Sequence, residues 1–277
     1  MNVALLHQLH ELTEGLHRIG LRPVIGGGLG IYLLFRDRSQ MVRATQDIDL
    51  LITRSQAAEP AAREAMARAI VDELHYVARE DGRCFRFAKE PARQLDILAP
   101  PMDGIATEGG RVKLVRTKLH GRLTPEACFI DEDLRTVDLS HLLPGSVPAT
   151  SLLVNVPSPA NMLILKLFAF DERDSASRQD KERAQAHAYD IYLIVTLAQL
   201  SDYREGRNFL HRHAGSDIIR KARQIVAAKF SALEQSGWRH VLAAAAFYPG
   251  GPMVEKREEV DMARRLLLRW FEEQKSG

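Results

Sequence analysis

The sequence has few of the features that mark secreted, membrane-embedded or strongly charged chains. Only two of its 277 residues are cysteines, too few for a disulfide framework and without the spacing of a zinc site. The formal net charge is only +2, so no overall field draws the chain to nucleic acid, although basic residues can still cluster locally. No apolar run reaches the length of a membrane span, and the amino terminus has no signal-peptide pattern. We therefore expect a globular, cytoplasmic protein that is free of membrane.

Length and hydrophobic content allow two compact domains, and one proline pair indicates where they divide. Hydrophobic residues make up 45% of the chain. Ser158 is a good N-cap and Pro159 a good first helical residue, so a helix should begin there. Beyond this point the pattern is almost entirely helical. We predict an α/β domain over residues 1–156 and a helical domain over residues 157–277.

Residues 24–52 have the pattern around which the rest can be arranged. A short apolar run leads into glycines and an apolar helix, and a basic loop then leads to the strand that holds Asp47 and Asp49. Gly26 and Gly27 lack Cβ atoms, so the backbone can turn tightly there, and the first N–H groups of the following helix would point at an anion. The pattern predicts strand, glycine turn, helix and strand.

The acidic strand carries the candidate chemistry. Side chains alternate along a strand, so Asp47 and Asp49 should project from one face and Ile48 and Leu50 from the other. Two neighbouring carboxylates repel each other unless a cation or a shared proton separates them, and hard oxygen ligands favour Mg²⁺ or Mn²⁺ over Zn²⁺. A metal-bound triphosphate fits this combination. Taken alone, an Asp-x-Asp pair more often only ends a strand.

Two familiar phosphate-binding motifs are a poor match to the glycine turn. A dinucleotide-binding fold needs Gly-x-Gly-x-x-Gly, and the third glycine is missing whether the count begins at Gly26 or at Gly28. A P-loop needs Gly-Lys followed by Ser or Thr, and this turn has none.

Asp96 is the candidate third acid. It lies alone in the apolar run of residues 94–98, which we expect to form a hairpin with residues 84–88. Burying a carboxylate without a partner costs several kcal/mol of folding free energy, unless the carboxylate takes up a proton. Even an uncharged polar group costs roughly 2–7 kcal/mol when it is buried without a hydrogen bond. Joining Asp47 and Asp49 around a metal would explain it, and so would exposure on an edge strand.

The other predicted elements complete the two domains. The periodicity of apolar residues predicts helices over residues 5–19, 59–74, 159–170, 181–200, 217–233, 238–247 and 254–271. It predicts strands over residues 111–119, 127–130 and 152–156.

The order of these motifs resembles the nucleotidyltransferase superfamily that includes DNA polymerase β. That signature is an apolar residue, two glycines, a helix and an acid-apolar-acid strand, with a third acid on a later strand. Ile25-Gly26-Gly27 matches its first part and Asp47-Ile48-Asp49 its second. The version with Arg43 and Thr45 ahead of the acids is similar to the AbiEii-type toxin branch, one half of some bacterial toxin-antitoxin pairs.

The resemblance implies a fold, a chemistry and further site residues. The fold is a mixed sheet flanked by helices, with a helical domain after it. Lys166, Arg173, Lys181 and Asp190 follow the order of basic and acidic residues in the helical half of that branch, which implies phosphate contact by Lys166 and a supporting role for Asp190. The segment between Lys181 and Asp190 is longer than in the branch, so the match at Lys181 is poor.

The implied activity is metal-dependent nucleotidyl transfer. Asp47, Asp49 and Asp96 would hold Mg²⁺ or Mn²⁺, and a nucleoside triphosphate such as ATP would donate a nucleoside monophosphate to a hydroxyl. The residues implied to hold the nucleotide are Gly26, Gly27, Arg43, Thr45, Lys166 and Asp190. The acceptor could be tRNA or another RNA, and a cognate antitoxin protein is an implied partner. The alternatives are a catalytically silent nucleotide- or partner-binding module and an enzyme that modifies small antibiotics.

Overall fold

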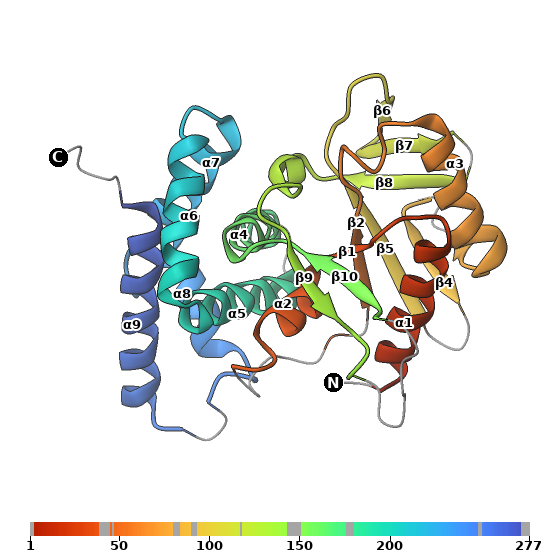
Figure 1. Cartoon of the computed structure of the whole chain (residues 1–277). Coiled ribbons are helices and arrows are strands. Elements are labelled where there is room, and N and C mark those ends of the chain that lie inside the picture. Colours follow the sequence, from red (N-terminus) through yellow and green to blue (C-terminus); the bar gives the residue numbers. More distant parts are fainter. Residues whose placement is uncertain are drawn as a thin grey trace. The chain divides into compact units, whose positions relative to one another are not determined.

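The computed structural model describes residues 3–38, 45, 47–79, 84–89, 93–116, 118–142, 151–175, 180–248 and 251–272. The chain forms two compact units, one from Met1–Leu34 with Ala44–Ser158 and the other from Phe35–Arg43 with Pro159–Gly277. The first unit is a mixed sheet with helices, and the second is helical (Figure 1). The predicted fold class, α/β with a helical region after it, is confirmed.

The first unit is built on one sheet whose strands run in the order β6-β7-β8-β5-β2-β1-β10-β9, with β4 paired to β5 and β3 to β4. The central pair β2 and β5 is parallel, while β1 is antiparallel to β2. The strands are β1 (Val24–Ile25), β2 (Asp47–Leu51), β3 (Val77–Ala78), β4 (Arg86–Lys89), β5 (Arg93–Ala99), β6 (Thr107–Glu108), β7 (Arg111–Val115), β8 (Leu119–Leu123), β9 (Arg135–Asp138) and β10 (Leu153–Val156).

Among the residues that the structure describes, three α-helices accompany this sheet and share its apolar core. They are α1 (Val3–Arg18), α2 (Gly27–Phe35) and α3 (Pro60–Ala67), the last continued by the π-helical segment η1 (Arg68–Glu73). Ile48 and Leu50 of β2 are buried in one core cluster with Leu9 and Leu12 of α1, whereas Asp47 and Asp49 on the other face of β2 are half-buried. One face of β2 therefore packs in the core, and the other face carries the two carboxylates.

The first helix ends where the sequence predicts, and glycine is the cause. Gly20 has φ +74, a conformation that residues with a Cβ rarely adopt. The Leu21 N–H donates to the Leu16 carbonyl, and the Gly20 N–H donates to the His17 carbonyl. This is the Schellman arrangement, which satisfies the last carbonyls of a helix.

Two strand predictions are wrong. Residues 127–130 are not a strand, because Pro125–Phe129 forms a 3₁₀ helix, η2, in which the Ala127 N–H donates to the Thr124 carbonyl. Proline at its start has its φ fixed in the helical range and no N–H for a strand ladder. The predicted single strand over residues 111–119 is two antiparallel strands, β7 and β8, joined by a short turn.

The second unit is a set of six helices among the residues that the structure describes. They are α4 (Pro159–Asp174), α5 (Lys181–Leu197), α6 (Leu200–Arg212), α7 (Asp217–Lys229), α8 (Ser236–Ala243) and α9 (Met253–Phe271). Aromatic side chains fill its interior, among them Trp238, whose indole N–H donates to the Phe230 carbonyl at 2.7 Å. None of the helices in the described part of the chain combines the length and apolar character needed to cross a membrane.

The short segment after α2 belongs with these helices. The Arg38 guanidinium lies 2.9 Å from the Asp202 carboxylate and also donates to the Leu197 carbonyl. Asp202 in turn accepts from the Gln199 backbone N–H in a capping box that starts α6. Arg38, one of the basic residues of the loop predicted between the glycine turn and the acidic strand, is thus held by a helix end.

Candidate active site

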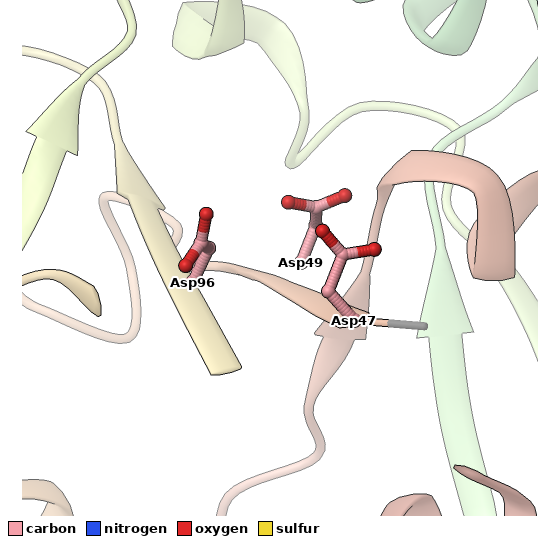
Figure 2. A group of neighbouring side chains, drawn as sticks. All are labelled: Asp47, Asp49 and Asp96. Atoms are coloured by element: carbon pink, nitrogen blue, oxygen red, sulfur yellow. The ribbon is translucent and has the colours of Figure 1, made fainter. Parts of the chain in front are cut away.

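Three carboxylates gather on the polar face of the central strands. In the parallel ladder of β2 and β5, Asp49 is the partner of Asp96, and Asp47 is the partner of Gln94. Asp47, Asp49 and Asp96 each offer an oxygen atom, and these atoms lie within 4.8 Å of one another. Figure 2 shows the three side chains projecting to the same side of the two strands. The structure therefore brings together the three acids that the sequence predicts to share a site.

The glycine turn lies directly against one of these acids. The Gly26 N–H donates to the Asp49 carbonyl at 2.8 Å, and the Gly26 carbonyl accepts from the Gly30 N–H in the first turn of α2. Gly27 has φ +61, and a Cβ added there would lie 1.7 Å from Asp49 Oδ2. Only glycine fits this position, because the backbone is left-handed and the carboxylate occupies the space of a side chain. The start of α2 and the acidic strand are one packed arrangement.

Thr45 orients another acid of the cluster. Its hydroxyl donates to Asp47 Oδ1 at 2.8 Å, and the residue is only 4% exposed. A buried hydroxyl that donates to a carboxylate restricts the rotation of that carboxylate. Arg43, the other residue of the predicted Arg-x-Thr motif, lies outside the described residues.

Asp96 has two polar neighbours that sequence reasoning missed. Arg86 Nε lies 3.3 Å from Asp96 Oδ2, and the Gln94 amide donates to Asp96 Oδ1 at 3.2 Å. Burial raises the pKa of Asp96, Arg86 acts to lower it, and the charge of Asp47 raises it further, with a net upward result. The predicted hairpin contains the information needed to place Arg86 beside Asp96, because the antiparallel register of β4 and β5 pairs these two residues.

The donor set suits a hard divalent cation. All three groups are carboxylates, which bind Mg²⁺ or Mn²⁺ in preference to softer ions. Burial is the main cause of the raised pKa of Asp96, and the nearby charge of Asp47 raises this pKa further. The residues present therefore fit a metal ion that would lie among the three oxygen atoms.

The two predicted site residues of the helical unit form a buried ion pair. Lys166 Nζ lies 2.7 Å from Asp190 Oδ2, and the two side chains are 6% and 1% exposed. Lys166 is on α4 and Asp190 on α5. Asp190 is thus a buried acid with a partner. The ion pair with Lys166 offsets the free-energy cost of burying a carboxylate in an apolar helix.

A glycine turn at the start of a helix, followed by a strand with two acids and a parallel strand with a third, defines a nucleotidyltransferase-type fold. The comparison with known families agrees with this class. A family described as "Nucleotidyl transferase AbiEii toxin, Type IV TA system" matches residues 16–249, and the chain belongs to that family. Among curated proteins, none matches the chain.

Proposed function

We propose that the protein transfers a nucleoside monophosphate from a nucleoside triphosphate to a hydroxyl group, with Mg²⁺ or Mn²⁺ as the cofactor. The observation that carries the proposal is the cluster of Asp47, Asp49 and Asp96 beside the glycine turn. Membership of a nucleotidyltransferase family supports the same class of reaction.

Asp47, Asp49 and Asp96 would hold the metal ion. When bound, a divalent cation neutralises phosphate charge and orients the phosphates of the donor. Thr45 keeps Asp47 in position through its hydroxyl, and Gly27 leaves the room that the Asp49 carboxylate needs. The chain itself contributes mainly positioning and electrostatics, as is usual in phosphoryl transfer.

The reaction exchanges one phosphorus–oxygen bond for another. The acceptor oxygen forms a bond to the α-phosphorus, and the bond from the α-phosphorus to the oxygen that bridges it to the β-phosphorus breaks. Pyrophosphate leaves with the electron pair of that bond. Asp96 takes the proton of the attacking hydroxyl, because it stands on the strand farther from the glycine turn and its oxygen lies with those of the other acids.

The nucleotide would be held from several elements. The Gly26 N–H donates to the Asp49 carbonyl, so Gly26 shapes the turn, and the N–H groups that would face an anion are those of α2 from Gly27 onward. Arg43 and Lys166 would add positive charge to the phosphates, and Thr45 and Asp190 would orient their neighbours. These roles follow the family resemblance. ATP is one candidate donor.

The family description supports a role as the toxin of a type IV toxin-antitoxin pair. We propose a cytoplasmic toxin with a cognate antitoxin protein as its partner. tRNA is the candidate acceptor, with a small antibiotic as the alternative acceptor and a silent binding module as the alternative function.

A labelling experiment separates these possibilities. The protein is incubated with Mg²⁺, total RNA and each nucleoside triphosphate in turn, labelled at the α-phosphate. The variant Asp49→Asn and the control Asp103→Asn, which lies in an exposed turn, are assayed in parallel. We expect label in RNA with the unaltered protein and Asp103→Asn, and none with Asp49→Asn. Nucleotide binding without label transfer to any acceptor would contradict the proposal and favour the silent module.

The toxin role has a separate test in cells. Induced expression of the unaltered protein should halt growth, while Asp49→Asn at the same expression level should not. Growth that is indifferent to both proteins would contradict the toxin role.

A further inference from the structure

One face of α6 in the helical unit combines basic and apolar side chains. Arg207, Leu210 and His211 are spaced three and four residues apart, and Ala214 follows in the turn where its N–H donates to the His211 carbonyl. Residues at this spacing lie on the same side of a helix. Leu210 is buried, Arg207 is half-buried, and His211 and Ala214 are exposed. This face therefore runs from the interior of the unit to solvent.

A glycine within α6 lets an aromatic ring lie against the helix. A Cβ added at Gly206 would lie 2.2 Å from Cζ3 of Trp270, so a side chain there would displace the indole ring. The ring of Tyr203 packs on the indole with the two ring centroids 4.8 Å apart, and Trp270 is only 1% exposed. Glycine is less favourable than alanine inside a helix, and the close packing of Trp270 explains its presence here. Trp270 is thus a fixed wall beside the basic face of α6.

Three helices leave a cavity of about 220 Å³ between this wall and the basic face. Its lining comes from α6 and the turn after it, from Arg223 of α7, and from Trp270 and Glu272 at the end of α9. Figure 1 shows α6 and α9 side by side, and the two helices contact each other. One water molecule takes up about 30 Å³ of liquid volume. The cavity therefore has room for a small organic molecule.

The polar groups of the cavity favour an anion. Arg207, His211 and Arg223 supply N–H donors to the lining, and Glu272 supplies a carboxylate. Neither Arg207 nor His211 forms an ion pair with a residue that the structure describes, whereas Arg223 takes part in a further interaction. We therefore assign the anion to Arg207 and His211. A half-buried guanidinium that no acid neutralises pairs strongly with phosphate oxygens, and His211 adds a donor and, when protonated, a second positive charge.

We propose that this cavity binds a small organic phosphate that carries hydroxyl groups. The phosphate pairs with Arg207 and His211, and the organic part lies on Leu210 and Ala214. A ligand hydroxyl donates to the Glu272 carboxylate, which accepts hydrogen bonds but repels a bare inorganic anion. The site goes beyond the proposed nucleotidyl transfer, because all of its residues belong to the helical unit and none belongs to the acid cluster or the glycine turn. A bound ligand holds three helices together and so stabilises that unit.

Calorimetric titration of the full chain with ribose 5-phosphate, inorganic phosphate and uncharged ribose tests this site. Ribose 5-phosphate should bind more tightly than inorganic phosphate, and ribose should not bind. Arg207→Gln should weaken binding of ribose 5-phosphate about tenfold or more, and His211→Gln several-fold. Glu272→Gln should strengthen binding of inorganic phosphate, because a repelling charge is removed. Ala214→Phe keeps every charge but fills the cavity, and should block binding of ribose 5-phosphate.

Arg204→Gln is the matched control, because it removes the same charge from an exposed position of α6 outside the cavity lining. It should bind ribose 5-phosphate as the unaltered protein does, and thermal melting verifies that each variant is folded. The proposal is overturned if the unaltered protein does not bind ribose 5-phosphate at millimolar concentration. Equal affinity in folded Arg207→Gln and the unaltered protein, or an equal loss in Arg204→Gln, would overturn it as well. None of these measurements depends on nucleotidyl transfer.

Discussion

Asp49 and Asp96 are register partners on adjacent parallel strands, although one follows the glycine turn and the other belongs to a later hairpin. Their side chains share a face with Asp47, and Arg86 lies within ion-pair distance of Asp96. The folded chain therefore holds like charges together at a cost that a bound cation would offset.

The first prediction concerns the glycine that faces this cluster. Gly27→Ala should destabilise the first unit and abolish its response to metal, because the new Cβ would collide with Asp49 Oδ2. Gly104 is the matched control, since it has φ +73 and nothing within 4 Å of an added Cβ. Gly104→Ala should cost only the left-handed backbone strain, about 1–2 kcal/mol. Equal effects of the two changes on melting temperature and metal response would contradict the account.

The second prediction concerns the buried pair of Lys166 and Asp190. Lys166→Met should destabilise the protein by about 3–5 kcal/mol, because the Asp190 carboxylate would stay buried without its partner. The double variant Lys166→Met with Asp190→Leu should recover most of that loss. Urea unfolding of the three proteins measures the difference. A double variant no more stable than Lys166→Met would show that the pair does not act as a unit.

The third prediction concerns acid stability of the helical unit. Lys229 Nζ lies 2.9 Å from carboxylates of both Asp171 and Asp174, and Lys221 lies 3.0 Å from Asp171. Burial acts to raise the pKa of each aspartate, but the hydrogen bonds from lysine outweigh it and lower both pKa values. A carboxylate whose pKa is lower in the folded chain than in the unfolded chain stabilises the fold at pH values above its ordinary pKa. This contribution is lost as the pH falls through the lowered pKa.

Lys229→Met measures that contribution. Its cost in unfolding free energy should be largest near neutral pH and should shrink as pH falls below about 4, where the aspartates take up protons. Lys181→Met removes an exposed lysine from the same unit and should show no such trend. A cost of Lys229→Met that is constant between neutral and acidic pH would contradict the prediction.

Local patterns were enough to predict the elements that form the candidate site. Residues 24–52 fold as strand, turn, helix and strand because glycine and the alternation of acids with apolar residues act within a few residues. The hairpin that carries Asp96 follows from alternation on both sides of a short turn. The meeting of Asp96 with Asp49 is a long-range pairing, and the resemblance to a known family supplied it in advance.

The missed features depend on distant partners. β9 is a strand because residues 135–138 pair with β10, and its sequence alone has little alternation. α6 went unpredicted, and its start depends on the Gln199 and Asp202 capping box that Arg38 also contacts. Arg38 comes from a segment far away in the sequence. Tertiary contacts of this kind override local propensity.

The most direct test of the central claim is thermal melting with and without Mn²⁺. If Asp47, Asp49 and Asp96 share a cation, Mn²⁺ at about 100 times its Kd should stabilise the unaltered protein by about 2.7 kcal/mol. Asp103→Asn should respond in the same way. Asp47→Asn should melt no lower than the unaltered protein without metal, because it removes a repelling charge, and should gain little from Mn²⁺. An equal Mn²⁺ response in Asp47→Asn and the unaltered protein, or no response in either, would contradict the claim that these acids form a metal site.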